Sequence, residues 1–131
     1  MTQHLLLLLA LLPLSAYSQK KEPAIIKVKK LYTENIDSIV AKLEREGYRI
    51  SKKANDINYI RLKPIRYEYG NRFNKISIEI WIKEESAELT GYDTKRNPKK
   101  IDLVNDGSEK SDSAIQTIEA VAGNLGHVNI W

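Results

Sequence analysis

The side chains best suited to binding a ligand lie on one face of the strands that the sequence predicts. Trp81 and Tyr92 point away from the predicted core, because inward and outward residues alternate along a strand. Tyr59 and Arg61 share that outward face, and Lys83 lies two residues beyond Trp81. Exposed tryptophan and tyrosine beside arginine are typical of binding hot spots. The sequence therefore predicts a ligand-binding face made of these five residues.

Such a face would suit a sugar ring, an aromatic group or a peptide, with Arg61 and Lys83 pairing an anionic group. The same pattern also has purely structural interpretations. Scattered exposed aromatic residues are common on soluble proteins, and cross-strand aromatic pairs stabilise a sheet by themselves. The C-terminal residues 126–131 could also cover this face. The prediction of a binding face stands beside these alternatives.

The sequence offers little for nucleophilic or metal chemistry. It contains no cysteine, and His127 is the only histidine in residues 19–131. A serine nucleophile would need that histidine, yet no serine lies in a nucleophile-elbow motif. The neighbouring acids do not follow the spacing of a calcium loop; they are Asp102, Asp106, Glu109 and Asp112. We therefore predict no catalytic residue, no metal site and no cofactor.

Glu79 and Glu88 carry the one alternative that involves catalysis. Both are expected on the outward face, across neighbouring strands. A pair of carboxyl groups supplies the acid and the base of glycoside hydrolysis. On a solvated face near Arg61 and Lys83, the same two acids are also ordinary surface charges. An acid-dependent enzyme acting on glycans is therefore an alternative, and the main prediction is that the protein is not an enzyme.

Strand patterns fill the middle of the sequence. Isoleucines alternate from Ile76 to Ile82, which predicts a strand with one apolar face. The segment 87–92 continues that face, and Gly70-Asn71 before it is typical of a hairpin turn. In the alternating segment 57–62 the apolar residues of one face stand at even positions, and in segment 65–69 they stand at odd positions. This change of parity predicts a bulge near Lys63-Pro64.

Helix patterns lie on either side of these strands. Apolar residues spaced as on one helix face predict a helix over about residues 34–46, with Thr33 or Asn35 as its cap. A charged loop, 94–110, precedes a second helix whose capping box begins at Ser113. With possible strands at 24–30 and 48–51, the order is β-α-β-β-β-β-α.

This order predicts an α+β fold: an antiparallel sheet of four to five strands with two helices packed on one face. It resembles the helix-on-sheet arrangement of TATA-binding-protein-like and helix-grip domains. The resemblance lies in the order of elements alone, so it implies a fold and no function.

Residues 1–18 have the features of a cleavable secretory signal peptide. Leu5 to Leu12 form an apolar run too short to span a membrane, and small residues follow it. We predict cleavage between Ser18 and Gln19, then a polar tail at 19–23 and a single domain at 24–131. An uncleaved N-terminal anchor is the alternative. Without a cysteine at the cleavage site, the protein is not expected to be a lipoprotein.

Export and charge together limit the expected function. The net charge of +4 is compatible with anionic partners and equally with solubility alone, and export makes a nucleic-acid partner improbable. We therefore expect a periplasmic or secreted binding module, without a membrane anchor after cleavage, whose partner is an envelope protein or a glycan. A structural or assembly subunit of a bacterial envelope complex, dimerising through its sheet, is the main alternative.

Overall fold

The computed structural model describes residues 25–93 and 108–128. The predicted signal peptide at 1–18 and the polar tail at 19–23 lie outside these residues. So do residues 94–107 of the predicted charged loop and the last three residues of the chain. The description below concerns the two described segments.

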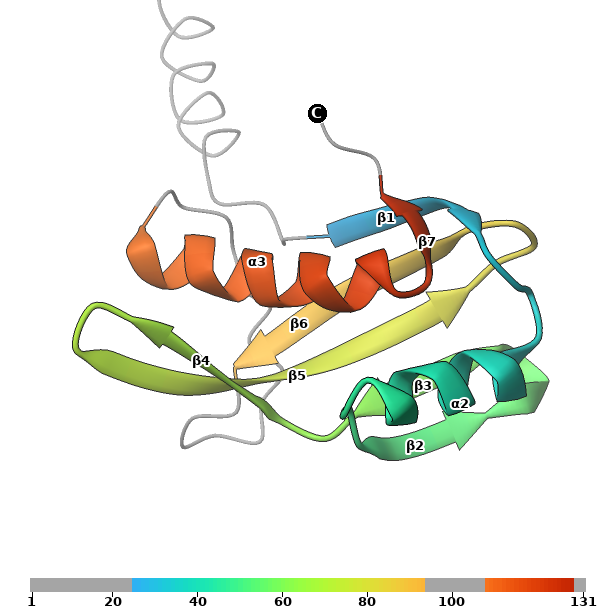
Figure 1. Cartoon of the computed structure of the whole chain (residues 1–131), viewed down its shortest axis with the longest axis horizontal. Helices are drawn as coiled ribbons and strands as arrows, with labels where there is room; N and C mark the ends of the chain where they lie inside the picture. Colours follow the sequence, from blue (N-terminus) through green and yellow to red (C-terminus); the bar gives the residue numbers. More distant parts are fainter. Residues whose placement is uncertain (1–24, 94–107, 129–131) are drawn as a thin grey trace, which may run out of the picture.

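The described segments form an α+β fold around a sheet whose pairings are all antiparallel (Figure 1). The sheet has seven strands in the order β2-β3-β5-β6-β1-β7, with β4 also beside β5. The strands are β1 (Ile25–Leu31), β2 (Ile50–Ala54), β3 (Tyr59–Leu62), β4 (Ile65–Tyr69), β5 (Arg72–Ile82), β6 (Ala87–Asp93) and β7 (Gly126–Val128).

The predicted count of four to five strands is therefore wrong, for two reasons. The segment predicted as one bulged strand is divided into β3 and β4, and the short β7 adds an edge strand beside β1. A pattern of three residues is too short to identify such a strand in the sequence. It forms because the turn after the second helix brings Gly126 opposite Leu31.

A bulge separates β3 from β4, as the change of parity predicts. Both strands pair with β5, but the register shifts by one residue between them: Arg61 lies opposite Glu79, whereas Ile65 lies opposite Ile76. The extra residue falls at Lys63-Pro64, where proline has no N–H to donate to a ladder. The bulge returns both Leu62 and Tyr67 to the buried face of the sheet.

The start of β3 differs from the prediction. A short 3-10 helix, η1 (Asn55–Ile57), occupies the residues before it, so the strand begins at Tyr59 and not at Ile57. Asn58 ends this turn with a φ of 52°, in the left-handed region that asparagine tolerates better than most residues. The change of direction leaves Ile57 exposed and brings Tyr59 into the ladder opposite Trp81.

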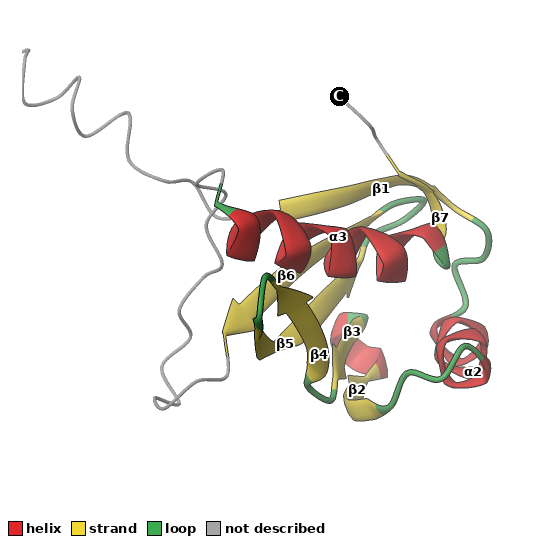
Figure 2. Ribbon diagram, turned by 60° about the vertical axis from the view of Figure 1, so that its left-hand side comes forward, coloured by secondary structure: helices red, strands yellow, loops and turns green. Residues whose placement is uncertain are grey.

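Two helices, α2 (Ile36–Arg45) and α3 (Glu109–Gly123), lie on the same side of the sheet (Figures 1 and 2). The predicted helix at 34–46 is confirmed with slightly shorter bounds. Asn35 is its cap, because its side-chain oxygen accepts hydrogen bonds from the backbone N–H groups of Asp37 at 2.9 Å and Ser38 at 3.2 Å.

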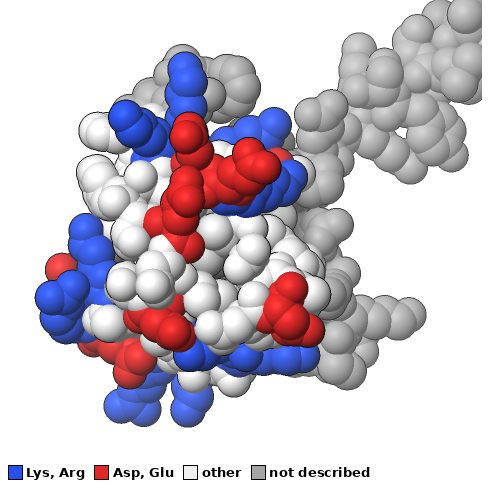
Figure 3. Space-filling view, turned by 90° about the vertical axis from the view of Figure 1, so that its right-hand side faces the viewer, with Lys and Arg blue, Asp and Glu red and all other residues white. Residues whose placement is uncertain are grey.

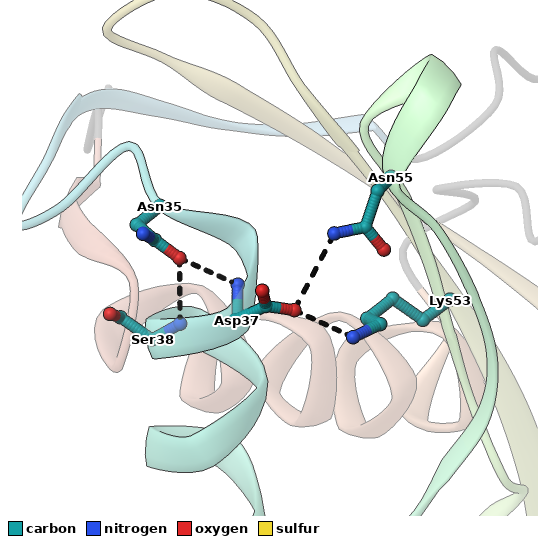
Figure 4. Close-up of polar contacts among 5 residues, drawn as sticks. All are labelled: Asn35, Asp37, Ser38, Lys53 and Asn55. Atoms are coloured by element: carbon teal, nitrogen blue, oxygen red, sulfur yellow. Dashed lines mark hydrogen bonds and ion pairs between the residues drawn. The ribbon is translucent and has the colours of Figure 1, made fainter.

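The first turn of α2 is also joined to the edge of the sheet (Figure 4). Asp37 Oδ1 lies 2.6 Å from Lys53 Nζ of β2 and accepts a hydrogen bond from Asn55 Nδ2 at 3.5 Å. The hydrogen bond from Lys53 lowers the pKa of Asp37, and the bond from Asn55 adds to it. All three side chains are exposed, so this contact orients the helix more than it stabilises the fold.

The second helix starts earlier than predicted. It begins at Glu109 and is capped by Ser108, whose Oγ accepts from the N–H of Ser111 at 3.1 Å. Ser113, the predicted cap, lies inside the helix, and its carbonyl accepts from Thr117 Oγ1. The acidic residues at 109 and 112 look like loop charges in the sequence, but negative charge is favourable in the first turn of a helix.

The core lies between the helices and one face of the sheet. Ile76, Ile78, Ile80 and Ile82 of β5 are all buried on this face, as their alternation predicts. They belong to one cluster with the buried residues of both helices. Gly91 of β6 lies on the same face, where α3 approaches it closely: a Cβ there would clash with Ile76 and lie 2.9 Å from Ile118 Cδ1.

Gly91→Ala is expected to lower the free energy of unfolding by about 1–3 kcal/mol, because the added methyl group overpacks the core between β5 and α3. Gly123→Ala is the matched control, since nothing lies within 4 Å of its Cβ position. It should leave stability unchanged or raise it by up to about 1 kcal/mol. Urea unfolding of both variants measures the difference, and equal stabilities would contradict the packing described for α3.

Candidate functional site

The structure places four of the five predicted binding residues together on the sheet face opposite the helices. We call this the outward face. It consists of the β5 residues that alternate with the core isoleucines, from Phe73 to Trp81, and of their cross-strand neighbours. Tyr59 lies opposite Trp81, Arg61 opposite Glu79, and Tyr92 opposite Ser77. The fifth residue, Lys83, follows the end of β5.

Trp81 is the exposed aromatic group of this cluster. It keeps 38 % of its surface accessible, whereas its partner Tyr59 keeps only 7 %. The two ring centroids are 4.5 Å apart with an interplanar angle of 49°. This tilted pairing is a favourable aromatic geometry, so Tyr59 holds the indole in place from the side. Tyr59 is therefore a support for the exposed ring, and offers little surface of its own to a ligand.

The main correction to the sequence analysis concerns Glu79, which was expected as a solvated charge. It is 1 % exposed although it lies on the outward face. Tyr92 donates a hydrogen bond from its hydroxyl to Glu79 Oε2 at 3.3 Å, and Arg61 Nη2 lies 3.8 Å from Oε1. A buried carboxylate is costly unless it is paired and hydrogen-bonded. These side chains provide that pairing, and we refer to Tyr59, Arg61, Glu79 and Tyr92 as the Glu79 cluster.

Tyr59 also belongs to this cluster through its hydroxyl. Burial, together with a hydrogen bond to Glu79 and the charge of that carboxylate, raises the pKa of Tyr59 to about 12. The positive charge of Arg61 opposes this rise only in part. Tyr59 therefore stays protonated at neutral pH and remains a hydrogen-bond donor to Glu79. Two tyrosine hydroxyls and one guanidinium thus converge on a single carboxylate.

Lys83 and Glu88 flank Trp81 at the solvent side. Glu88 lies opposite Trp81 in the β5–β6 ladder, and its Oε1 is 3.1 Å from Lys83 Nζ. Exposed ion pairs of this kind contribute little to stability and exchange readily. Lys83 can therefore leave Glu88 for an anionic group of a ligand beside the indole.

The structure gives Glu79 and Glu88 separate partners and separate environments. Glu79 lies opposite Thr90, while Glu88 lies opposite Trp81, so the two acids are diagonal neighbours and not a facing pair. Glu79 is buried among tyrosines and Arg61, while Glu88 is partly exposed beside Lys83. Acid catalysis uses two carboxyl groups on either side of a bound substrate, whereas here Glu79 is buried and Glu88 pairs with Lys83.

Two shallow pockets lie on the helix side of the sheet. One, of about 480 Å³, is lined by residues around Tyr48 and Pro64, and the other, of about 330 Å³, lies between Tyr67 and α3. Neither includes a residue of the Glu79 cluster or Trp81. Both of these pockets are thus separate from the outward face.

Residues 25–93 and 108–128 contain no group of three or more acidic or histidine side chains that could hold a metal ion. Within the same two segments, neither helix has the length and apolar character needed to cross a membrane.

Comparison with known proteins gives no family assignment. No protein-family model matches the chain, and no curated protein matches it significantly. Arguments about its function therefore depend on the geometry of the outward face itself.

Two residues of the outward face are missing from the sequence-based prediction of the site. The burial of Glu79 depends on residues from β3 and β6 that are distant in the sequence, so alternation predicts only that this acid faces outward. Phe73 was not placed at all, since the predicted strand began at Ile76. The Gly70-Asn71 turn was the available signal: a two-residue hairpin loop starts the next strand at Arg72, which puts Phe73 on the outward face.

Tyr59 should make stability fall with pH above the ordinary tyrosine range. The unfolded chain releases this proton near pH 10, but the folded chain keeps it to about 12. Between these values the unfolded state binds fewer protons, so the free energy of unfolding decreases as pH rises. Urea unfolding at several pH values should show a shallower decrease for Tyr59→Phe and for Glu79→Gln than for the wild type.

Tyr48 still contributes to the pH dependence of stability in these variants, because burial also raises its pKa. Tyr48→Phe is therefore the matched control, and its effect should add to that of Tyr59→Phe. An unchanged pH dependence in Tyr59→Phe would mean that Tyr59 is not held against Glu79.

Proposed function

We propose that this protein is an exported binding module that holds a glycan on the outward face of its sheet, with Trp81 as the central contact. The observation that carries the proposal is the environment of Trp81. Its ring is accessible on the face of the sheet opposite α2 and α3, and Tyr59 fixes it from one side. A large aromatic side chain that is both exposed and held in place is typical of a binding contact.

The neighbours of Trp81 suit a sugar. A flat aromatic ring offers an apolar surface to the C–H groups of a sugar ring, while nearby polar groups fix its orientation. Arg61 and Lys83 supply hydrogen-bond donors within this neighbourhood, and their side chains are 41 % and 57 % exposed. Glu88 adds an acceptor for hydroxyl groups beside Lys83.

The Glu79 cluster supports this proposal by keeping the binding groups rigid. Glu79 pairs with Arg61, which removes part of the freedom of a long side chain before any ligand binds. Tyr59 contacts both Glu79 and the indole ring of Trp81. A site that is ordered in advance loses less conformational entropy on binding, so its contacts produce more affinity.

The two other functions expected from the sequence have less support. An assembly subunit that dimerises through the sheet rests on the sequence alone. The separate environments of Glu79 and Glu88 give no support to an acid-dependent enzyme. We therefore propose glycan binding without catalysis and without a cofactor.

Export is the second part of the proposal, and it rests on the sequence of residues 1–18. If the signal peptide is cleaved as proposed, the protein recovered from the periplasm or the medium should begin at Gln19. Intact-mass measurement and N-terminal sequencing check this directly. Recovery of the protein only in the cytoplasm with residues 1–18 retained would contradict it, and Ala16→Arg should block the cleavage.

Trp81→Ala is expected to reduce the affinity for the glycan by roughly thirtyfold, equivalent to about 2 kcal/mol, as for a binding hot spot. Stability should decrease by the contribution of the Tyr59–Trp81 aromatic pair, about 0.5–1.5 kcal/mol, together with the loss of the buried part of the indole surface. A screen of the wild type on immobilised glycans first identifies a bound glycan, and titration calorimetry then measures its affinity for both proteins. Thermal unfolding measures the change in stability.

Tyr32→Ala is the matched control, because Tyr32 is 58 % exposed and packs against His127 beyond the end of β1, away from Trp81. It should bind like the wild type. Equal affinity of Trp81→Ala and the wild type, or the absence of any glycan bound by the wild type, would show the proposal to be wrong.

A further inference from the structure

The outward face extends well beyond Trp81. Phe73 lies on the same side of β5, eight residues before it, and a strand rises by about 3.3 Å per residue, so roughly 26 Å separates the two aromatic rings along the strand. Phe73 is 52 % exposed. The outward face therefore has an accessible aromatic ring near each end of its longest strand.

Phe73 has a basic partner, whereas the ring partner of Trp81 is Tyr59 and the basic residues Arg61 and Lys83 lie near it on the same face. The guanidinium carbon of Arg66 lies 4.0 Å from the centroid of the Phe73 ring, which is a cation–π contact. Arg66 also lies 3.3 Å from Glu68 on the surface of the same hairpin. A cation held over an aromatic ring at one end of β5 thus matches the combination of Trp81 with Arg61 and Lys83 at the other end.

Basic side chains predominate along the outward face. Six lie on it or at its ends, namely Lys27, Lys52, Arg61, Arg66, Lys75 and Lys83, against the acids Glu68, Glu79 and Glu88. Among the described residues, Lys27 and Lys52 form no ion pair, and Glu79 is buried beneath Arg61. By contrast, acidic and basic side chains are interspersed at the end of the molecule nearest α2 (Figure 3).

We infer that the outward face binds an extended anionic glycan that lies along β5, with Trp81 and Phe73 each contacting a sugar ring. This inference rests on the proposed function and deepens it. Carboxylate or sulfate groups of the polymer would pair with the basic residues between and beside the two rings, of which Arg61 and Arg66 are the best placed. Lys27 and Lys52 would pair with groups at the sides of the chain.

The spacing of the aromatic rings favours a glycan over a nucleic acid. Single-stranded nucleic acids are bound by aromatic side chains on which successive bases stack. Here Lys75, Ser77 and the buried Glu79 lie between Phe73 and Trp81 on β5. Two distant rings separated by polar groups suit a polymer whose units make mainly polar contacts.

The test measures how affinity depends on the length and the charge of the glycan. Titration calorimetry compares a disaccharide with a long oligomer of galacturonic acid, a sulfated oligosaccharide of similar length and a neutral glucan of the same length. The protein without residues 1–18 should bind at least one anionic oligomer about tenfold more tightly than the disaccharide and the glucan, and added salt should weaken that binding.

Variants test whether Phe73 causes the dependence of affinity on glycan length. Phe73→Ala should bind the disaccharide like the wild type but lose the gain of about tenfold on the long oligomer. Phe73→Tyr should keep that gain because it retains the ring, and Trp81→Ala should weaken binding of both ligands. Ile57→Ala is the control, since Ile57 is 54 % exposed in η1, outside the β5 row.

The outcomes separate the two proposals. If affinity does not depend on length and Phe73→Ala behaves like the wild type, while Trp81→Ala still loses binding, the extended site is wrong and the Trp81 site remains. Preference for the neutral glucan would contradict the role of the basic residues. Tighter binding of single-stranded DNA of equal length would make the polymer a nucleic acid. If no glycan binds at all, the proposed function itself fails.

Discussion

The register of β5 is the constraint on which the rest of the structure depends. This strand pairs with β3, β4 and β6, so three neighbours take their positions from it. Its isoleucines build the core on one face, while Phe73, Glu79 and Trp81 lie on the other. A slip of one residue would exchange the two sets completely. The same alternation therefore stabilises the fold and assembles the outward face.

Burial of Glu79 shows that the outward face is more than the solvated side of a sheet. A carboxylate at 1 % exposure needs partners that pair its charge, and two tyrosine hydroxyls and Arg61 are among those of Glu79. This arrangement limits the positions of the side chains around Trp81. The bulge at Lys63-Pro64 has a related role, since it lets β3 contribute Tyr59 and Arg61 to this face while β4 contributes Arg66 farther along β5.

We propose a division of the molecule into a packed side and a binding side. Both helices cover one side of the sheet, where the core lies. Six basic side chains and the accessible rings of Phe73 and Trp81 lie on or beside the other side. An extended, shallow and basic surface suits a polymer better than a small molecule, which needs a concave pocket to bury most of its surface.

The sequence by itself determined the local features of this protein. Alternation placed the core isoleucines and Trp81 on opposite faces of β5, the parity change located the bulge, and helical spacing identified α2. Tertiary structure alone decided that Glu79 is buried and that β7 joins the sheet. Alternation and capping depend on neighbours in the chain, whereas burial on a sheet depends on cross-strand partners. The partners of Glu79 come from positions 59, 61 and 92, which only the folded chain brings together.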